Sequence, residues 1–218
     1  MTRIRLGTLF CVLALSAVLG ACTTAGASAP PASLSAPASG GASSASCPTS
    51  QPAAMPAGQT RTVTITTALG GITIKVEADL SPIAAGNFVA LAQCGFYDGV
   101  VFHRLVPRFV IQGGDPTGTG TGGPGYTIQD EPVTAKYGRG TVAMARSSDP
   151  NSVGSQFFIV LDDAARDALA SYNTYQIIGT VTAGMETVDA IAATPNSGQP
   201  NNTALKPVAM DHVTVATP

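Results

Sequence analysis

Two short segments of alternating apolar and polar residues, separated by a pair of glycines, restrict this chain more than any other feature of its sequence. Residues 62–66 (TVTIT) and 72–76 (ITIKV) repeat their apolar side chains every second position, which is the period of a half-buried β-strand. Gly70 and Gly71 stand between them, where a tight hairpin turn needs positive φ angles. The sequence therefore predicts an antiparallel hairpin at the start of a β-rich domain.

The rest of residues 60–218 continues the β pattern. Six further segments favour strands: 100–104, 109–113, 141–145, 156–161, 175–182 and 208–215. Capping and stop residues predict two helices. One is expected to begin at Ser81 and Pro82 and to end before Gly95, and the second covers residues 184–194. We expect an all-β fold with two helices, an eight-stranded closed antiparallel β-barrel capped by helices, because closure leaves no exposed edge strand.

The N-terminus has the pattern of an export signal. Arg3 and Arg5 precede an uncharged run of 14 residues, 6–19, which is too short to span a bilayer of roughly 30 Å. Residues 19–22 (LGAC) resemble the lipobox of bacterial lipoproteins, in which the Cys is lipidated after cleavage. We expect residues 1–21 to be a signal peptide and Cys22 to carry a lipid anchor; the alternative is an ordinary secretory signal that happens to contain a Cys.

A low-complexity segment follows the lipobox. Of the 37 residues 23–59, 29 are Ala, Ser, Pro or Gly, and none is charged. Such a composition lacks the large apolar side chains that offset the entropy of ordering. Residues 22–59 are therefore predicted to be the lipidated Cys and a flexible tether. It would hold the domain, residues 60–218, on the outer face of the bacterial cytoplasmic membrane, with the lipid as its only membrane contact.

Charge argues against nucleic-acid partners. Only Arg3 and Arg5 are charged before Arg61, so residues 61–218 hold 11 − 2 = 9 basic and 13 acidic residues, a net charge of about −4. Nucleic-acid binding depends on clustered Lys and Arg. We expect no nucleic-acid partner.

Cofactor and hydrolase motifs are weak or missing. The glycines of residues 120–125 satisfy GxGxxG, but no βαβ unit surrounds them. The only two histidines, His103 and His212, fall on separate predicted strands, which argues against a metal site. The chain has no GxSxG sequence, the motif of a hydrolase nucleophile. Neither a metal nor a cofactor is expected.

The cysteines fit an oxidising compartment. Cys11 would leave with the signal peptide and Cys22 would be lipidated, so Cys47 and Cys94 remain as an even pair. A disulfide between them is compatible with export, and two unrelated thiols are the alternative, because the sequence gives no distance between them. Neither Cys has a CxxC partner or a neighbouring His, so a catalytic thiol or a zinc site is not expected.

Two long motifs carry a resemblance. Residues 101–115 (VFHRLVPRFVIQGGD) and 154–159 (GSQFFI) resemble, in order and separation, the two signatures of cyclophilins, the barrel-fold peptidyl-prolyl cis-trans isomerases. The similarity extends from Thr62 to Val215 and includes the first predicted helix at Asn87 and Phe88. It implies a monomeric enzyme that acts on proline-containing segments of unfolded or exported proteins.

The reaction of such an enzyme needs few catalytic groups. Rotation about a peptide bond faces a barrier of roughly 18–20 kcal/mol, and a millionfold acceleration removes about 8 kcal/mol of it. A hydrogen-bond donor aimed at the prolyl nitrogen stabilises the twisted amide selectively, without a nucleophile, a proton transfer or a metal. The resemblance assigns this donor to Arg104, whose alternative role is a structural salt bridge.

The resemblance supplies the remaining site residues. It places Gln112 and Phe109 beside Arg104 as further catalytic residues. The substrate-binding residues that it implies are Val110, Gly120, Ala145, Arg146, Ser147, Gln156, Phe158, Leu169 and Tyr175. Period two along a strand agrees, since Val110 shares a face with Gln112, and Gln156 shares one with Phe158. Phe102, Ile111 and Phe157 are expected in the barrel core.

Three departures from the family pattern carry expectations. Arg146 replaces a common Asn and would add a second cation to the rim, which favours acidic or more extended peptides. The chain has no Trp, with Ala168 nearest to the usual position, so weak cyclosporin-type inhibition is expected. Tyr175 stands where His is usual.

Two other classes of function compete with the enzyme. One is a non-catalytic module that binds Pro-containing peptides or a partner protein on a lipid anchor, for which Arg104 would be needless. The other is a glycan-binding barrel, against which the missing Trp counts.

Overall fold

The structure, a computed structural model, describes residues 46–217. The predicted signal peptide, the lipidation site at Cys22 and residues 23–45 of the predicted tether lie outside the described residues. Between residues 46 and 217, no helix combines the length and the apolar character needed to cross a membrane.

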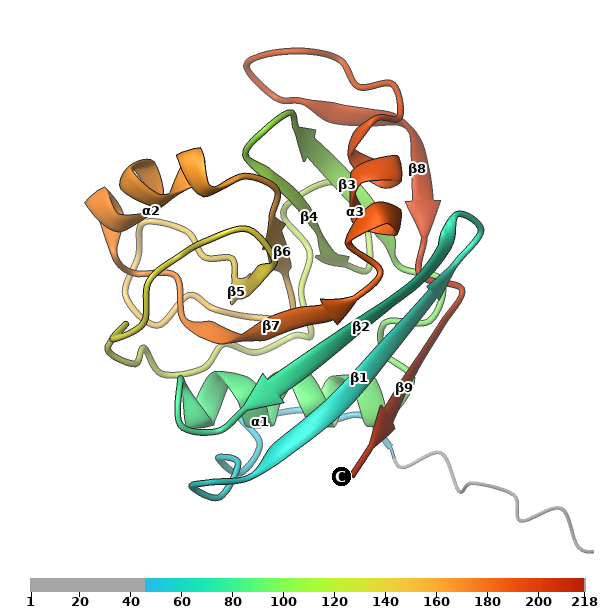
Figure 1. The fold of residues 1–218 in the computed structure, drawn as a ribbon. Coiled ribbons are helices and arrows are strands. Elements are labelled where there is room, and N and C mark those ends of the chain that lie inside the picture. Colours follow the sequence, from blue (N-terminus) through green and yellow to red (C-terminus); the bar gives the residue numbers. More distant parts are fainter. Residues whose placement is uncertain (1–45, 218) are drawn as a thin grey trace, which may run out of the picture. The chain divides into compact units, whose positions relative to one another are not determined.

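One nine-stranded antiparallel sheet forms the domain (Figure 1). Its strands are β1 (Thr60–Thr67), β2 (Gly70–Glu77), β3 (Val101–Val106), β4 (Val110–Asp115), β5 (Thr141–Met144), β6 (Phe157–Val160), β7 (Ile177–Ala183), β8 (Thr203–Ala209) and β9 (His212–Ala216). They follow the order β8-β3-β4-β6-β5-β7-β2-β1-β9. The sheet therefore curls into a half-barrel with β8 and β9 at its two ends.

The predicted closed eight-stranded barrel is wrong in two respects. The expected strand 208–215 is two strands, because β8 pairs with β3 whereas β9 pairs with β1. The chain crosses between them at Met210 and Asp211, whose amides donate to the carbonyls of Val100 and Thr66. No ladder joins β8 to β9 in the described sheet, so it has two edges and remains open.

The first hairpin is confirmed. β1 and β2 pair antiparallel from Thr60 opposite Glu77 to Thr67 opposite Gly70. Gly70 has a φ of 134°, which a residue with a side chain rarely adopts. The Thr67 hydroxyl donates to the Gly70 carbonyl at 2.9 Å and closes the turn.

The domain has three α-helices rather than two. The predicted pair is present as α1 (Pro82–Gln93) and α3 (Met185–Ala192). Helix α2 (Arg166–Tyr172) was not predicted from the sequence; it follows a single 3₁₀ turn, Asp163–Ala165, and spans only seven residues. Ser81 is the N-cap of α1, but its side chain makes no capping bond. The Glu131 carboxylate instead accepts from the amides of Ile83 and Ala84 at 2.8 and 2.9 Å.

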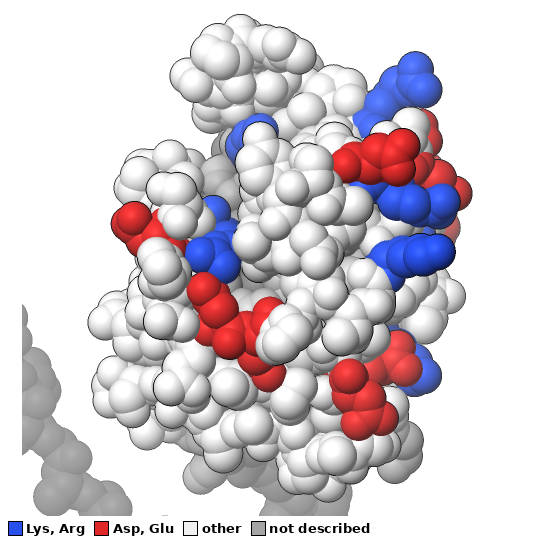
Figure 2. Space-filling view, turned by 90° about the vertical axis from the view of Figure 1, so that its left-hand side faces the viewer, with Lys and Arg blue, Asp and Glu red and all other residues white. Residues whose placement is uncertain are grey.

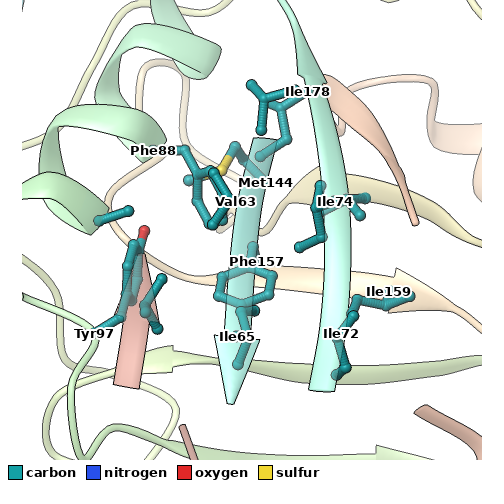
Figure 3. Close-up of a cluster of buried hydrophobic side chains, with 14 of the residues drawn as sticks. Val63, Ile65, Ile72, Ile74, Phe88, Tyr97, Met144, Phe157, Ile159 and Ile178 are labelled. Carbon is teal, nitrogen blue, oxygen red and sulfur yellow. The ribbon is translucent and has the colours of Figure 1, made fainter. Parts of the chain in front are cut away.

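The two faces of the sheet divide the apolar side chains into two clusters. The main core lies inside the curled sheet, against α1 and α3, and contains Phe88, Met144 and Phe157 (Figure 3). Phe102, Ile111 and Phe157 belong to it, as expected. The second cluster lies under α2 and contains Val110, Phe158 and Leu169. Successive side chains of a strand point to opposite faces of the sheet. Strands β4 and β6 therefore contribute side chains to both the main core and the second cluster.

Residues 46–59 form an N-terminal strap on α1, although the sequence analysis placed them in the flexible tether (Figure 1). Met55 is buried in the main core, and its amide donates to the Pro82 carbonyl at 2.9 Å. The Cys47 and Cys94 Sγ atoms form a disulfide that joins the strap to the C-terminal end of α1. The folded unit therefore begins before the predicted boundary at residue 60.

A substitution at Gly86 tests the contact between the strap and α1. Gly86→Ala has two opposing effects on stability. Ala favours the interior of a helix by about 1 kcal/mol. A Cβ at position 86, however, would collide with the Ala53 carbonyl and lie 2.9 Å from the Met55 amide. These are backbone atoms that cannot swing away, so we expect Gly86→Ala to lower the free energy of unfolding by about 1–3 kcal/mol.

Urea unfolding of the two proteins measures this difference. Gly123→Ala is the matched control, since its added Cβ would meet no atom within 4 Å. A Gly86→Ala protein as stable as the wild type would show that the strap does not lie against α1.

Candidate active site

A row of side chains crosses four adjacent strands at the centre of the site. Arg104 on β3 pairs with Gln112 on β4, Gln112 pairs with Phe158 on β6, and Phe158 pairs with Ala143 on β5. The antiparallel register alone thus places a cation, an amide and an aromatic ring next to one another.

A pocket of about 410 Å³ opens beside this row. Its lining residues are Arg104, Phe109, Val110, Gln112, Ala145, Arg146, Phe158, Leu169, Tyr172 and Tyr175. Val110, Phe158 and Leu169 are almost fully buried and form its floor. The unpredicted helix α2 contributes Leu169 and Tyr172, so the pocket depends on an element that the sequence analysis did not assign.

A second hollow of about 390 Å³ adjoins the first and shares Gln112, Ala145 and Arg146 with it. Gly120, Ser147 and Gln156 line this second hollow. All twelve residues predicted for catalysis and substrate binding therefore line one hollow or the other. An extended peptide could occupy both hollows across the Ala145 edge.

A chain of hydrogen bonds connects the polar side chains. Arg104 Nη1 donates to Gln112 Oε1 at 3.3 Å, and Gln112 Nε2 donates to Gln156 Oε1 at 2.9 Å. Gln156 Nε2 in turn donates to the carbonyls of Gly120 and Gly122 at 3.0 and 2.9 Å. Each amide orientation is fixed by the next group, so the Gln112 oxygen is held towards the Arg104 guanidinium.

Arg104 is not engaged in an ion pair within the described part of the chain. The six ion pairs among residues 46–217 involve other side chains. A structural salt bridge, the alternative role for Arg104, is therefore absent from this region. Its guanidinium keeps donors for a ligand in the pocket.

Asp115 anchors the glycine-rich loop whose Gly120 and Gly122 carbonyls end the series of hydrogen bonds that begins at Arg104. Its carboxylate accepts from the Thr117 amide and hydroxyl at 2.7 and 2.8 Å, and from the amides of Gly120 and Gly122 at 2.6 and 3.1 Å. Burial raises the pKa of Asp115, but the hydrogen bonds from Thr117, Gly122 and Gly120 outweigh it and lower the pKa to about 2. The sequence analysis missed this role; its only signal was an Asp ahead of alternating Thr and Gly.

His103 lies beneath the same loop. It is buried, neither ring nitrogen has a hydrogen-bond partner among the described residues, and a Cβ on Gly120 would lie 3.8 Å from Nε2. Burial lowers the pKa of His103, Asp115 raises it, and Arg104 lowers it further, with a net decrease. The imidazole is therefore neutral at pH 7. Across residues 46–217, no three His, Cys, Asp or Glu side chains gather in a way that could hold a metal ion.

Arg146 is not the free second cation expected at the rim. Its side chain is only 9% exposed, and Nη1 pairs with Asp130 Oδ2 at 2.9 Å. Nη2 also donates to the Asp149 carbonyl at 2.7 Å. Because Asp130 neutralises the guanidinium, the expected preference for acidic peptides loses its physical basis. Arg146 instead holds two loops together at the wall of the second hollow.

Charged side chains of both signs are scattered over the side of the molecule on which α2 lies. Figure 2 shows Lys and Arg interspersed with Asp and Glu on this face, with uncharged residues between them. Mixed charge of this kind does not concentrate a ligand of one sign. Selectivity must therefore come from the hollows themselves.

The geometry defines a class of protein. A pocket with an apolar floor, suited to a small ring, walled by the Arg104 guanidinium and the Gln112 amide and continued by a hollow along a strand edge, fits a proline within an extended peptide. The site needs only shape and hydrogen-bond donors to bind it.

Comparison with known proteins agrees with this class. The profile of the family described as cyclophilin type peptidyl-prolyl cis-trans isomerase/CLD matches residues 62–215. The peptidyl-prolyl cis-trans isomerase CYP18-2 of Arabidopsis thaliana is 39% identical over 155 residues, covering 68% of this chain and 92% of the relative. The probable peptidyl-prolyl cis-trans isomerase A of Mycobacterium leprae is 35% identical over 176 residues, covering 72% and 93%.

A solved structure shares the fold. The crystal structure of a Cryptosporidium parvum cyclophilin type isomerase superposes with a TM-score of 0.64 at 30% identity, over 73% of this chain and 99% of that one. The chain belongs to the cyclophilin-type peptidyl-prolyl cis-trans isomerases. It is accordingly an isomerase enzyme, rather than the purely binding module or the glycan-binding barrel kept as alternatives.

The Asp115 anchor generates a prediction that depends on pH. Asn at position 115 offers one acceptor oxygen in place of two, so we expect Asp115→Asn to lower the free energy of unfolding near pH 6 by about 1–3 kcal/mol. The pKa of Asp115 in the folded chain, about 2, lies below the ordinary 3.8. The stability that the ionised Asp115 carboxylate contributes is therefore fully present at pH values above its ordinary pKa. This stability is lost as the pH falls through the pKa of the folded chain.

Denaturant unfolding near pH 6 and near pH 2 measures the difference between the two proteins. The difference should shrink at the lower pH. Asp211→Asn, at an exposed position, is the control and should change little at either pH. A difference that is the same at both values would contradict the role of the Asp115 carboxylate.

Proposed function

We propose that this isomerase lowers the barrier to X-Pro rotation by stabilising the twisted amide with Arg104, without a covalent intermediate. The proline ring lies on the apolar floor of the 410 Å³ pocket, beside Val110 and Phe158. The guanidinium donates to the prolyl nitrogen, whose lone pair becomes available only when conjugation is lost. The interaction is thus stronger in the transition state than in either ground state.

The observation that carries this proposal is the environment of Arg104. It is the one cation in the pocket wall without an acidic partner, since Arg146 is paired with Asp130 and Arg104 has only Gln112 as a side-chain partner within residues 46–217. Gln112 and Gln156 then hold the backbone of the peptide beside the twisting bond, and Phe109 closes the apolar side. A cyclophilin type isomerase from Cryptosporidium parvum has been crystallised in the presence of the dipeptide Ala-Pro, which supports a proline-containing ligand here.

The cellular context is part of the same proposal. The LGAC sequence at residues 19–22 supports a lipid on Cys22 and an export signal before it. Residues 23–45 would then span the distance from the membrane to the strap. The disulfide between Cys47 and Cys94 fits an oxidising compartment. We propose a monomer, anchored on the outer face of the bacterial cytoplasmic membrane, that assists the folding of exported proteins.

Replacement of Arg104 tests the mechanism. For a chain that begins at Thr23, we expect Arg104→Ala to lower kcat/KM on a short X-Pro peptide by at least about tenfold, about 1.4 kcal/mol of transition-state stabilisation. Arg104→Lys keeps the charge but not the planar fork of donors, so its loss should be intermediate. Arg108→Ala, an exposed cation on the same segment, is the control. Wild-type activity in Arg104→Ala would refute the assignment.

The absence of proton transfer predicts a flat pH profile. The guanidinium stays charged throughout the neutral range, and the lowered pKa of His103 keeps that ring neutral at pH 7 and above. With a peptide that has no titratable group, kcat/KM should be constant from about pH 7 to about pH 9. A bell-shaped curve, or a single titration near neutrality, would contradict the proposal.

A further inference from the structure

Tyr172 is a large aromatic side chain that the known reaction leaves unused. It is 69% exposed, and of the exposed large apolar residues in the described chain, Leu69, Tyr172 and Leu205, only Tyr172 lines the proline pocket. Exposed aromatic surface that borders a binding pocket is a common mark of ligand contact. Neither the resemblance nor the comparisons assign a role to this residue.

The tyrosine is held in place although it is exposed. It is the last residue of α2, and Asn173 ends the helix in the left-handed conformation, with its amide bonded to the Leu169 carbonyl. The Tyr172 ring packs edge-on against Tyr175, with centroids 6.3 Å apart. Tyr175 packs in the same way against Phe158, at 5.4 Å. An aromatic series therefore runs from the pocket floor to the surface.

The position of this series relative to the proline pocket decides what it can bind. The adjoining hollow, where Ser147 and Gln156 lie, does not include Tyr172 or Tyr175. A side chain next to the proline that extends towards α2 would therefore meet the two tyrosine rings. No acidic residue lines the pocket, and Arg104 is one of its walls. The surface thus suits an uncharged ring or a branched apolar chain and disfavours Lys or Arg.

We propose that Tyr172, with Tyr175, forms a second recognition surface for a large apolar or aromatic side chain that directly flanks the proline. The inference rests on the proposed function, because it assumes that proline occupies the pocket. Packing against the rings occurs in the ground and transition states alike. Its effect therefore falls on KM and kcat/KM rather than on kcat.

Isomerisation kinetics with matched peptides test the proposal. One peptide has Ala on both sides of the proline, and the others have Phe, or Lys, on one side in turn. We expect the wild type to prefer Phe to Ala at one flank by about 3- to 10-fold, the range that aromatic pairs provide. Tyr172→Ala should abolish this preference by raising KM for the Phe peptide, with a smaller change in kcat/KM for the Ala peptide. Tyr172→Phe should retain it.

Leu205→Ala is the control, since Leu205 is 62% exposed and lies on β8 outside the pocket. An equal loss with the Ala and Phe peptides would overturn the proposal, because it would show a structural role of Tyr172. No loss with either Phe peptide would also overturn it. A wild type without activity on any peptide would instead refute the proposed function, so the two failures are distinguishable.

Discussion

The hydrogen-bonded chain from Asp115 to Arg104 is the constraint on which the site depends. The Asp115 carboxylate holds the amides of Gly120 and Gly122, and the carbonyls of the same two glycines hold the Gln156 amide. Gln156 orients Gln112, and Gln112 orients the guanidinium. The glycine-rich loop and three long side chains thus acquire one arrangement before a peptide arrives. Preorganised donors of this kind stabilise a transition state without reorganising during the reaction.

The curled sheet makes this arrangement possible because each strand serves two faces. On β4, Ile111 belongs to the main core, whereas Val110 belongs to the cluster under α2. On β6, Phe157 and Phe158 divide in the same way. The rigid core therefore fixes the backbone that carries the pocket floor. The helix α2 covers the floor and brings the exposed Tyr172 to the edge of the pocket.

Much of this could be predicted from the sequence, and the failures have physical causes. The β1–β2 hairpin and helices α1 and α3 follow from local periodicity and turn residues. Six of the twelve predicted site residues lie in the two long motifs, and the wider resemblance supplies the other six. The split of residues 208–215 into β8 and β9 depends on partners far away in the chain. The strap was missed because Met55 and Cys47 are isolated among Ala, Ser and Pro. The pairing of Arg146 with Asp130 and the Glu131 cap on α1 are equally non-local.

We propose that Arg104 acts on the twisted amide and not on binding of the peptide. Exchange NMR on a bound X-Pro peptide separates the two roles, because it gives the rate of cis–trans interconversion on the enzyme and the Kd in one experiment. We expect Arg104→Ala to lower the rate on the enzyme by at least about tenfold and to leave the Kd within about twofold. A weaker Kd with an unchanged rate on the enzyme would contradict this proposal and would make Arg104 a binding residue.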